Sequence, residues 1–505
     1  MPYYLRSAGA SSVDHPPLKP RSVLMTLVAS SLVFAALALP AYADNRAKGA
    51  LSDVYLQIMA DKIEATGKGV QIALIDTGIV DVPGLRYSNV IIGPDFSFED
   101  QVPELRGRDT NGHGTHLAGI MVAADAAWVA GDHRRTAERV LGIAPDATLV
   151  SIKVGTANGA ADVTQVIAAI NWVIAHKNDP GFDIRVLNLA YGTDGTQDYR
   201  IDPLAYAVER AWRAGIVVVV AAGNNGPSGG LANPALDPYV IAVGGSEAGL
   251  GWQEAVAEFS SDTDGGRGVD IVAPGRSIIS LRNPGSYSDQ YNGAGWIGDW
   301  LVRGSGTSQA SAVVSAAVAL MLEVHPGLTP DQVKAALMEG ADKIKTDSTA
   351  SGYLNVRAAL KVHLDDVPQT WERSTGTGSI AAARGSHVLV IDGVPLTGEV
   401  DVFGNSWTGS SWTVDSWTGN SWTGNSWTGN SWTGNSWTGN SWTGNSWTGN
   451  SWTGNSWTGN SWTGSSWTGN SWTGNSWTGS SWTGNSWTGN SWTGGSWTGS
   501  SWTSL

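Results

Sequence analysis

Six short runs of almost continuous aliphatic residues lie between positions 70 and 273 of the chain. A strand with one face in water alternates apolar and polar residues, whereas runs that are apolar at nearly every position are typical of strands buried on both faces. The pattern therefore predicts a mostly parallel sheet. The six runs are residues 70–75, 148–154, 184–189, 216–222, 239–243 and 269–273.

Helical patterns separate these runs. Asp162 precedes apolar residues at helical spacing and is placed to cap that helix. Asp202-Pro203 is typical of a helix start and Gly215 of its end, while residues 329–332 (Thr-Pro-Asp-Gln) form a capping-box pattern. Alternating strands and helices predict an α/β fold with helices on both faces of the sheet, and a site at the carboxyl ends of the strands. The apolar positions after Asp162 are Val163, Val166, Ile167, Ile170 and Ile174.

A helix of a different kind follows Ser308. Residues 312–324 are apolar on every side except at Ser315 and Glu323. A helix that is apolar all round is buried. We therefore expect Ser308 at the N-terminus of a central, rigid element.

The N-terminus has the pattern of a secretion signal. Arg21 precedes an apolar run over residues 23–39, and Ala41-Tyr42-Ala43 provides a small-x-small cleavage site. The sequence predicts a signal peptide over residues 1–43, an N-terminal segment over 44–66, and a protein that is secreted or associated with the cell surface. An uncleaved signal anchor is the alternative, because the apolar run approaches the length of a short membrane span.

The C-terminal part divides into two segments beyond a main domain at residues 67–360. Residues 361–404 form a transition with an expected hairpin, 387–391 and 397–403, turning through Asp392-Gly393. From residue 405 to 505 the chain repeats Ser-Trp-Thr-Gly-Asn every five residues, with 20 tryptophans from Trp407 to Trp502. The tail is either a β-rich solenoid or roll, or a flexible low-complexity segment. Cell-wall glycan, or other copies of the tail, are the partners that such regularly spaced aromatic residues suggest.

Composition excludes several classes of site and partner. A formal net charge of −14 argues against nucleic acid and, once the signal is cleaved, against an anionic membrane. The chain has no cysteine, so disulfides and thiolate metal sites are impossible.

Three short strings carry the residues of a hydrolytic triad. Asp76 lies in Ile72-Ala-Leu-Ile-Asp-Thr-Gly78, His113 in Asn111-Gly-His-Gly-Thr-His116, and Ser308 in Gly306-Thr-Ser-Gln-Ala-Ser311. A serine hydroxyl is a poor nucleophile at neutral pH unless an imidazole takes its proton and a carboxylate orients that imidazole. We therefore predict Ser308 as nucleophile, His113 as general base and Asp76 as the orienting acid.

In this order, and with their flanking glycines, the three strings resemble those of the subtilase family of subtilisin-like serine proteases, over about residues 67–360. The oxyanion hole is expected to combine the backbone N–H of Ser308 with a side-chain amide. Asn224 and Asn225 both follow the fourth predicted strand, and the spacing in the family favours Asn224. The resemblance implies a peptide or protein substrate.

The resemblance also implies where a substrate lies. Residues 187–192 resemble a wall of the specificity pocket, with Leu189, Ala190, Tyr191 and Gly192 as binding residues. Gly159, Ala160 and Ala161 resemble an edge that pairs with an extended substrate, and Ala222 and Gly223 are further predicted substrate-binding residues. Asp237-Pro238 resembles a cis-proline site beside the pocket.

The chemistry needs no cofactor, and the sequence shows no EF-hand spacing, so structural calcium is left open. We predict that His116 is structural, with a His-x-x-His metal pair as the alternative. The alternative function is a surface adhesion or assembly protein that retains a vestigial protease scaffold.

Overall fold

The computed structural model describes most of the main domain and part of the repeat tail. The predicted signal peptide and the predicted turn at Asp392-Gly393 lie outside the described residues. The described ranges are 49–85, 89–125, 142–248, 256–263, 265–344, 348–363, 368–391, 394–402, 407, 417–483, 486–488, 491–498 and 501–503.

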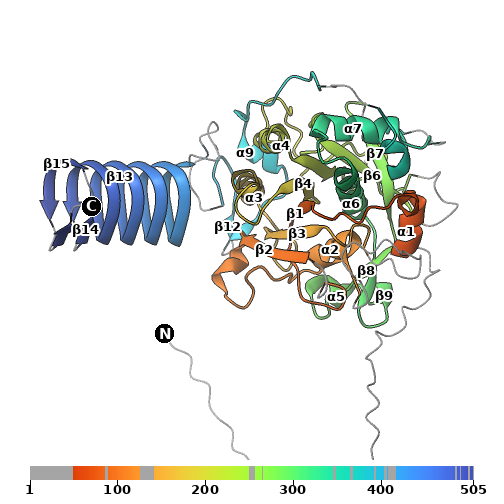
Figure 1. Cartoon of the computed structure of the whole chain (residues 1–505), viewed down its shortest axis with the longest axis horizontal. Helices are drawn as coiled ribbons and strands as arrows, with labels where there is room; N and C mark the ends of the chain where they lie inside the picture. Colours follow the sequence, from red (N-terminus) through yellow and green to blue (C-terminus); the bar gives the residue numbers. More distant parts are fainter. Residues whose placement is uncertain are drawn as a thin grey trace, which may run out of the picture. The chain divides into compact units, whose positions relative to one another are not determined.

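A seven-stranded, entirely parallel sheet organises the main domain (Figure 1). Its strand order is β2-β3-β1-β4-β5-β6-β7. Each of the six aliphatic runs overlaps one strand, so the prediction of a buried parallel sheet is confirmed. The strands are β1 (Gln71–Asp76), β2 (Asn89–Asp95), β3 (Thr148–Lys153), β4 (Ile184–Leu189), β5 (Val217–Ala221), β6 (Ile241–Glu247) and β7 (Ile271–Arg276).

The pattern of aliphatic runs missed β2. This strand lies at the edge of the sheet and pairs only with β3. None of its residues is fully buried, and Pro94 interrupts its aliphatic run. An edge strand can be polar and contain proline because one side of its backbone needs no partner.

Helices cover both faces of the sheet. Two of them, α2 (His113–Val122) and α6 (Thr307–Val324), pack against each other, and α3 (Val163–His176) and α4 (Pro203–Arg213) pack together on the opposite side (Figure 1). Further along the chain lies α7 (Pro330–Glu339).

The predicted helix caps are present. Asp162 accepts a hydrogen bond from Thr164 N and forms a capping box with Gln165. Asp202 caps α4 with Pro203 in its first turn, and Thr329 forms a capping box that begins α7. Each cap satisfies N–H groups that a helix leaves without a partner.

The central helix is α6. It is long and apolar enough to cross a membrane, but 89% of it is buried inside the protein, where it packs on strands β1, β4, β5, β6 and β7. This confirms the expectation of a helix buried on all sides.

Short elements complete the main domain. The N-terminal segment contributes a buried helix, and a small antiparallel sheet with strand order β8-β10-β9 lies next to α2. The short elements are α1 (Leu51–Gln57), η1 (Ala60–Lys62), η2 (Phe98–Gln101), β8 (Ile278–Leu281), α5 (Tyr287–Tyr291), η3 (Gly293–Gly295), β9 (Trp296–Ile297), β10 (Leu301–Gly304), α8 (Val356–Ala359), α9 (Ile380–Arg384), β11 (Val390–Ile391) and β12 (Val394–Pro395).

One local prediction, the hairpin, was right only in part, and another, the cis-proline site, was wrong. The hairpin pairs Val390 with Pro395 and Ile391 with Val394, so its second strand precedes the predicted 397–403. Arg384 donates hydrogen bonds to Gly398 O and Val400 O. These carbonyls of the predicted second strand therefore bind a side chain and do not pair with the first strand. The cis peptide bond joins Asn233 to Pro234 and not Asp237 to Pro238.

The repeat tail forms parallel strands in its described part: β13 (Trp417–Thr483), β14 (Ser486–Thr488), β15 (Ser491–Thr498) and β16 (Ser501–Thr503). Figure 1 shows β13 in blue as a ribbon wound into stacked coils. Trp472 pairs with Trp487, and Trp487 with Trp502, so partners lie 15 residues apart. One coil of this solenoid therefore holds three five-residue repeats, which is why an odd period can keep tryptophan in register with tryptophan.

Candidate active site

The predicted site residues lie near the carboxyl ends of neighbouring strands. Asp76 is the last residue of β1, and Leu189 is the last residue of β4. Asn224 follows the end of β5 by three residues. Since parallel strands end at one edge of the sheet, the fold brings these positions to the same side.

Asp76 and His113 are in direct contact. His113 Nδ1 lies 2.9 Å from Asp76 Oδ1 and 3.0 Å from Oδ2. Burial lowers the pKa of His113, but the charge of Asp76 and its hydrogen bond outweigh burial, so the pKa is raised above its usual value. The contact fixes the imidazole with its other nitrogen, Nε2, directed away from the carboxylate.

Asp109, which the sequence analysis did not single out, builds the turn that places His113 at the start of α2. Its carboxylate accepts hydrogen bonds from Gly112 N (2.7 Å) and Thr115 N (2.8 Å), and from Thr77 Oγ1 (2.8 Å) in the loop that carries Asp76. Burial raises the pKa of Asp109. A clue was available, because aspartate just before a helix start is a common cap.

Close backbone approach makes glycine necessary at position 114. A Cβ there would lie 2.1 Å from Gly78 O, far inside van der Waals contact. Gly114 thus lets the first turn of α2 touch the loop after β1, as the pairing of Asp76 with His113 requires.

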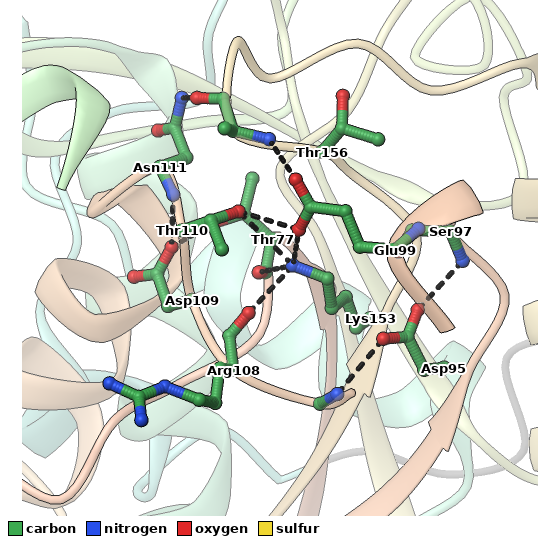
Figure 2. A network of polar contacts seen from close by, with 12 residues as sticks. Thr77, Asp95, Ser97, Glu99, Arg108, Asp109, Thr110, Asn111, Lys153 and Thr156 are labelled. Atoms are coloured by element: carbon green, nitrogen blue, oxygen red, sulfur yellow. Dashed lines mark hydrogen bonds and ion pairs between the residues drawn. The ribbon is translucent and has the colours of Figure 1, made fainter. Parts of the chain in front are cut away.

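Figure 2 shows a buried ion pair beneath these loops. Lys153 Nζ lies 2.8 Å from Glu99 Oε2 and donates hydrogen bonds to Thr77 O (3.0 Å) and Arg108 O (2.6 Å). The Lys153 side chain is fully buried and that of Glu99 is 15% exposed. Burial raises the pKa of Glu99, but the hydrogen bonds and charge of Lys153 and its other partners lower it overall. The pair ties the Asp76 loop to the segment before His113.

Glu99 also reaches the predicted substrate edge. Its Oε1 accepts from Ala157 N at 2.8 Å, and Asn111 Nδ2 donates to Ala157 O at 2.8 Å (Figure 2). Both interactions hold the beginning of the 156–161 loop against the segment that leads to His113. Sequence reasoning missed Glu99 and Lys153 because charged residues 54 positions apart carry no joint pattern.

His116 occupies a different environment one helical turn beyond His113. Its Nε2 lies 3.3 Å from both Ile278 O and Val302 O. Burial, followed by the charge of His113, lowers the pKa of His116 to about 4. A neutral imidazole directed at backbone carbonyls supports a structural role. Within the described ranges, no group of three or more His, Asp and Glu side chains is placed to hold a metal ion.

Ser308 is the second residue of α6, which begins at Thr307 with Gly306 at its N-cap. Thr307 N donates to Asn224 Oδ1 at 2.9 Å, and Gly223 N donates to Thr307 Oγ1 at 3.1 Å. The first bond uses the carbonyl oxygen of the Asn224 side chain and leaves its Nδ2 as a donor beside the segment that carries Ser308. Asn225 has a different partner, because its backbone N–H donates a hydrogen bond to Ser261 Oγ.

The structure joins His113 to Asp76 but not to Ser308, since no hydrogen bond links Ser308 Oγ to His113 among the described residues. The supporting elements do meet. Helices α2 and α6 pack together, and a Cβ on Gly304 would lie 2.7 Å from His116 Cε1 and 3.0 Å from Gln309 Nε2. Such hydrogen bonds are often long in unliganded enzymes and shorten when substrate binds.

The predicted substrate-binding residues lie in two loops and beside Asn224. Gly159 is exposed and Ala160 half-buried, whereas Ala161 is buried. Residues Ala190, Tyr191 and Gly192 are half-buried, as is Gly223, while Leu189 and Ala222 are fully buried. The exposed and half-buried residues of these loops, and not the buried Ala161, Leu189 and Ala222, are accessible to a ligand.

Tyr191 connects the two loops. Its hydroxyl donates to Ala161 O at 3.4 Å. Burial, and then the charge of Asp162, raise the pKa of Tyr191, so it stays a neutral donor. The predicted edge and the predicted wall are therefore neighbours in space.

Comparison with known proteins identifies the family. A model of the subtilase family matches residues 67–378, so the chain belongs to the subtilase family, a family of serine-type endopeptidases. Serine protease AprX of Bacillus subtilis (strain 168) is 39% identical over 293 residues, covering 56% of this chain and 63% of AprX. Subtilisin DY of Bacillus licheniformis is 32% identical over 311 residues, covering 60% of this chain and 96% of that protein. The crystal structure of fervidolysin from Fervidobacterium pennivorans aligns at 27% identity and a TM-score of 0.49, covering 62% of this chain and 46% of that one.

Proposed function

We propose that this chain is a secreted serine endopeptidase that cleaves peptide bonds through an acyl-enzyme. The observation that supports this most directly is the contact between His113 and Asp76 at the carboxyl edge of the sheet, beside the helix that carries Ser308. Family membership supports the reaction class. The match spans only 63% of AprX, so the activity of the whole chain is part of the proposal.

In the proposed mechanism, Ser308 Oγ attacks the scissile carbonyl carbon while His113 Nε2 takes its proton. Asp76 holds the imidazole in the required orientation and stabilises the imidazolium that forms. His113 then protonates the leaving amine, which departs and leaves an acyl-enzyme on Ser308. A water molecule, deprotonated by the same imidazole, releases the acid product and restores Ser308.

The proposed oxyanion hole consists of Ser308 N and Asn224 Nδ2. The N-terminus of α6 favours negative charge, because its first N–H groups have no partner within the helix. The hydrogen bond from Thr307 N to Asn224 Oδ1 orients the side-chain amide in advance. Preorganised donors of this kind stabilise the tetrahedral intermediate without any rearrangement during the reaction.

A protein or peptide substrate would bind as an extended chain between Gly159–Ala161 and residues 189–192. Both loops contain exposed or half-buried residues, and this supports access by an extended peptide.

Export and retention are the further parts of the proposal. The signal-like residues 1–43 support secretion, and one relative carries the name minor extracellular protease Epr. The regular register of tryptophans in the tail supports a role in surface retention or self-association. Deleting residues 405–505 should then release active enzyme into the medium, and unchanged partitioning between cells and medium would argue against this role.

The test of the enzyme proposal is active-site labelling of the full chain with a fluorophosphonate probe. We expect labelling of the wild type and its loss in Ser308→Ala. Ser305→Ala removes an exposed hydroxyl three residues away and serves as the matched control, with labelling retained. A folded wild-type protein that takes up no probe would instead favour the alternative, a surface adhesion or assembly protein with a vestigial protease scaffold.

A further inference from the structure

A fully buried ion pair joins the segment after the α/β domain to the predicted substrate edge. Arg384 Nε lies 2.5 Å from Asp162 Oδ2, and the side chains are 1% and 0% exposed. Arg384 is the last residue of α9, and Asp162 directly follows the edge Gly159–Ala161. Two charges at this depth are stable only as partners, because burial of either one alone is strongly unfavourable.

Arg384 has further partners that fix it. It donates to Gly398 O at 3.1 Å and Val400 O at 2.8 Å, so the chain beyond the hairpin closes over the guanidinium. Asp162 in turn caps α3 through Thr164 N. The ion pair therefore sets the position of the first turn of α3 and of the residue at which the edge ends.

The same helix α9 also contacts the opposite wall. Thr193 Oγ1, which follows the wall residue Gly192, donates to Ala383 O at 2.6 Å. A Cβ on Gly195 would lie 2.5 Å from Ala382 O, so the two segments touch at the backbone. Since α9 packs on both α3 and α4, it bridges the two loops between which the substrate would lie.

The edge loop is thus held at both ends. At its start, Glu99 and Asn111 bind Ala157, and at its end Arg384 binds Asp162. Its middle contains the exposed Gly159 and the half-buried Ala160, whose N–H groups bond within the loop to Thr156 O and Asn158 Oδ1. Fixing both ends of a short loop keeps its middle in one geometry, as contact with an extended peptide requires.

We propose that Arg384 is a positioning residue for extended substrates, and that residues 379–391 and 394–402 are a structural part of the substrate cleft. This rests on the proposed peptidase function. Arg384 touches neither the triad residues nor Asn224 in the contacts formed by the described residues. Its loss should therefore impair binding of long peptides and leave the chemistry at Ser308 unchanged.

The experiment compares two substrates in the full chain. One is a peptide amide of five or more residues, and the other is an ester of a single blocked amino acid, which cannot reach the edge. In Arg384→Met we expect kcat/KM for the peptide to fall about tenfold or more, mainly through KM, since small displacements of positioning groups reduce rates by up to about 10²-fold. The ester and the rate of fluorophosphonate labelling should change by less than about twofold, within the scatter of surface effects. The ratio of kcat/KM for the peptide to kcat/KM for the ester does not depend on the fraction of the protein that is folded.

Arg267→Met is the matched control. Arg267 also pairs with a carboxylate, Asp270, at 2.6 Å and donates to Val240 O, but Asp270 lies just before β7, at the opposite edge of the sheet. We expect this variant to lower the unfolding temperature without changing the ratio of the two kcat/KM values. Arg384→Lys should give a ratio between those of the wild type and Arg384→Met, because lysine keeps the charge but not the planar guanidinium.

Arg384→Met leaves Asp162 buried without its partner and can prevent folding. The double variant Asp162→Asn/Arg384→Met removes both charges, and its ratio then decides the question. A ratio equal to that of the wild type in the folded variants would overturn the role of Arg384. A wild type that neither hydrolyses the ester nor takes up the probe would instead overturn the peptidase function itself.

Discussion

The two sides of the candidate active site are built from different kinds of interaction. Around His113 the contacts are charged and buried: Asp76 binds the imidazole, Asp109 holds the turn, and Lys153 pairs with Glu99. Around Ser308 the contacts join uncharged groups: Thr307 N donates a hydrogen bond to Asn224 Oδ1 at 2.9 Å. In the proposed mechanism, the first side stabilises a positive imidazolium, whereas the second receives the negative charge of an oxyanion.

In this proposal, a charged side chain lies where the mechanism needs a fixed countercharge, beside the imidazole of His113. A carboxylate beside His113 raises its pKa and favours proton uptake. A carboxylate beside Ser308 would repel the oxyanion, and the neutral donors there avoid this while still pointing in the right direction.

The largest effect is expected from Asp76→Asn, which removes the charge on the histidine side. We expect kcat to fall about 10⁴-fold, because an amide stabilises the wrong tautomer of the imidazole. His113 must be neutral to accept a proton, so activity rises with pH through its pKa. Because Asp76 raises that pKa, its loss should shift the acidic limb of the pH–kcat/KM profile to lower pH. A limb that does not move would mean that another group controls it.

Lys153→Met tests the buried charges beneath the loops. We expect a loss of about 3–5 kcal/mol in the free energy of unfolding, because Glu99 keeps a charge without its partner. Urea denaturation measures this loss. The control is Glu99→Gln/Lys153→Met, which removes both charges and should recover part of the stability. Equal stability of the single and double variants would show that the charges themselves are unimportant.

The smaller effect on catalysis is expected on the neutral side, from Asn224→Ala. Removing one oxyanion donor lowers kcat by about 10²–10³-fold in subtilisin, and we expect a similar loss with KM little changed. Thr307→Val is the matched control, because it keeps the backbone bond to Asn224 and removes only the hydroxyl. We expect it to reduce kcat about tenfold at most, in line with a single hydrogen bond. A larger effect from Thr307→Val than from Asn224→Ala would reverse the assignment.

Much of the fold follows from local sequence. The aliphatic runs become strands β1 and β3–β7, and the caps at Asp162, Asp202 and Thr329 start helices where predicted. These features can be predicted from the sequence because burial on both faces and helix capping depend on residues that are close together in the chain. The edge strand β2 escaped because only one of its sides pairs, which leaves its sequence less constrained.

The candidate site divides in the same way. Asp76, His113, Ser308 and Asn224 stand in short recognisable strings, and the structure places Asp76 against His113 and Asn224 against the Ser308 segment. Glu99, Lys153 and Arg384 have no such strings around them. Arg384 lies 222 positions from Asp162, so only folding makes the two neighbours.

By itself the sequence determined the strands, the capped helices and the chemistry available at each string, because these depend on residue type and short-range spacing. Only the tertiary structure decided which distant charges pair beneath the loops, which proline bond is cis, and that the carbonyls of Gly398 and Val400 bind Arg384. A buried charge needs a partner wherever the chain can supply one, and the distance along the sequence does not limit where that partner comes from.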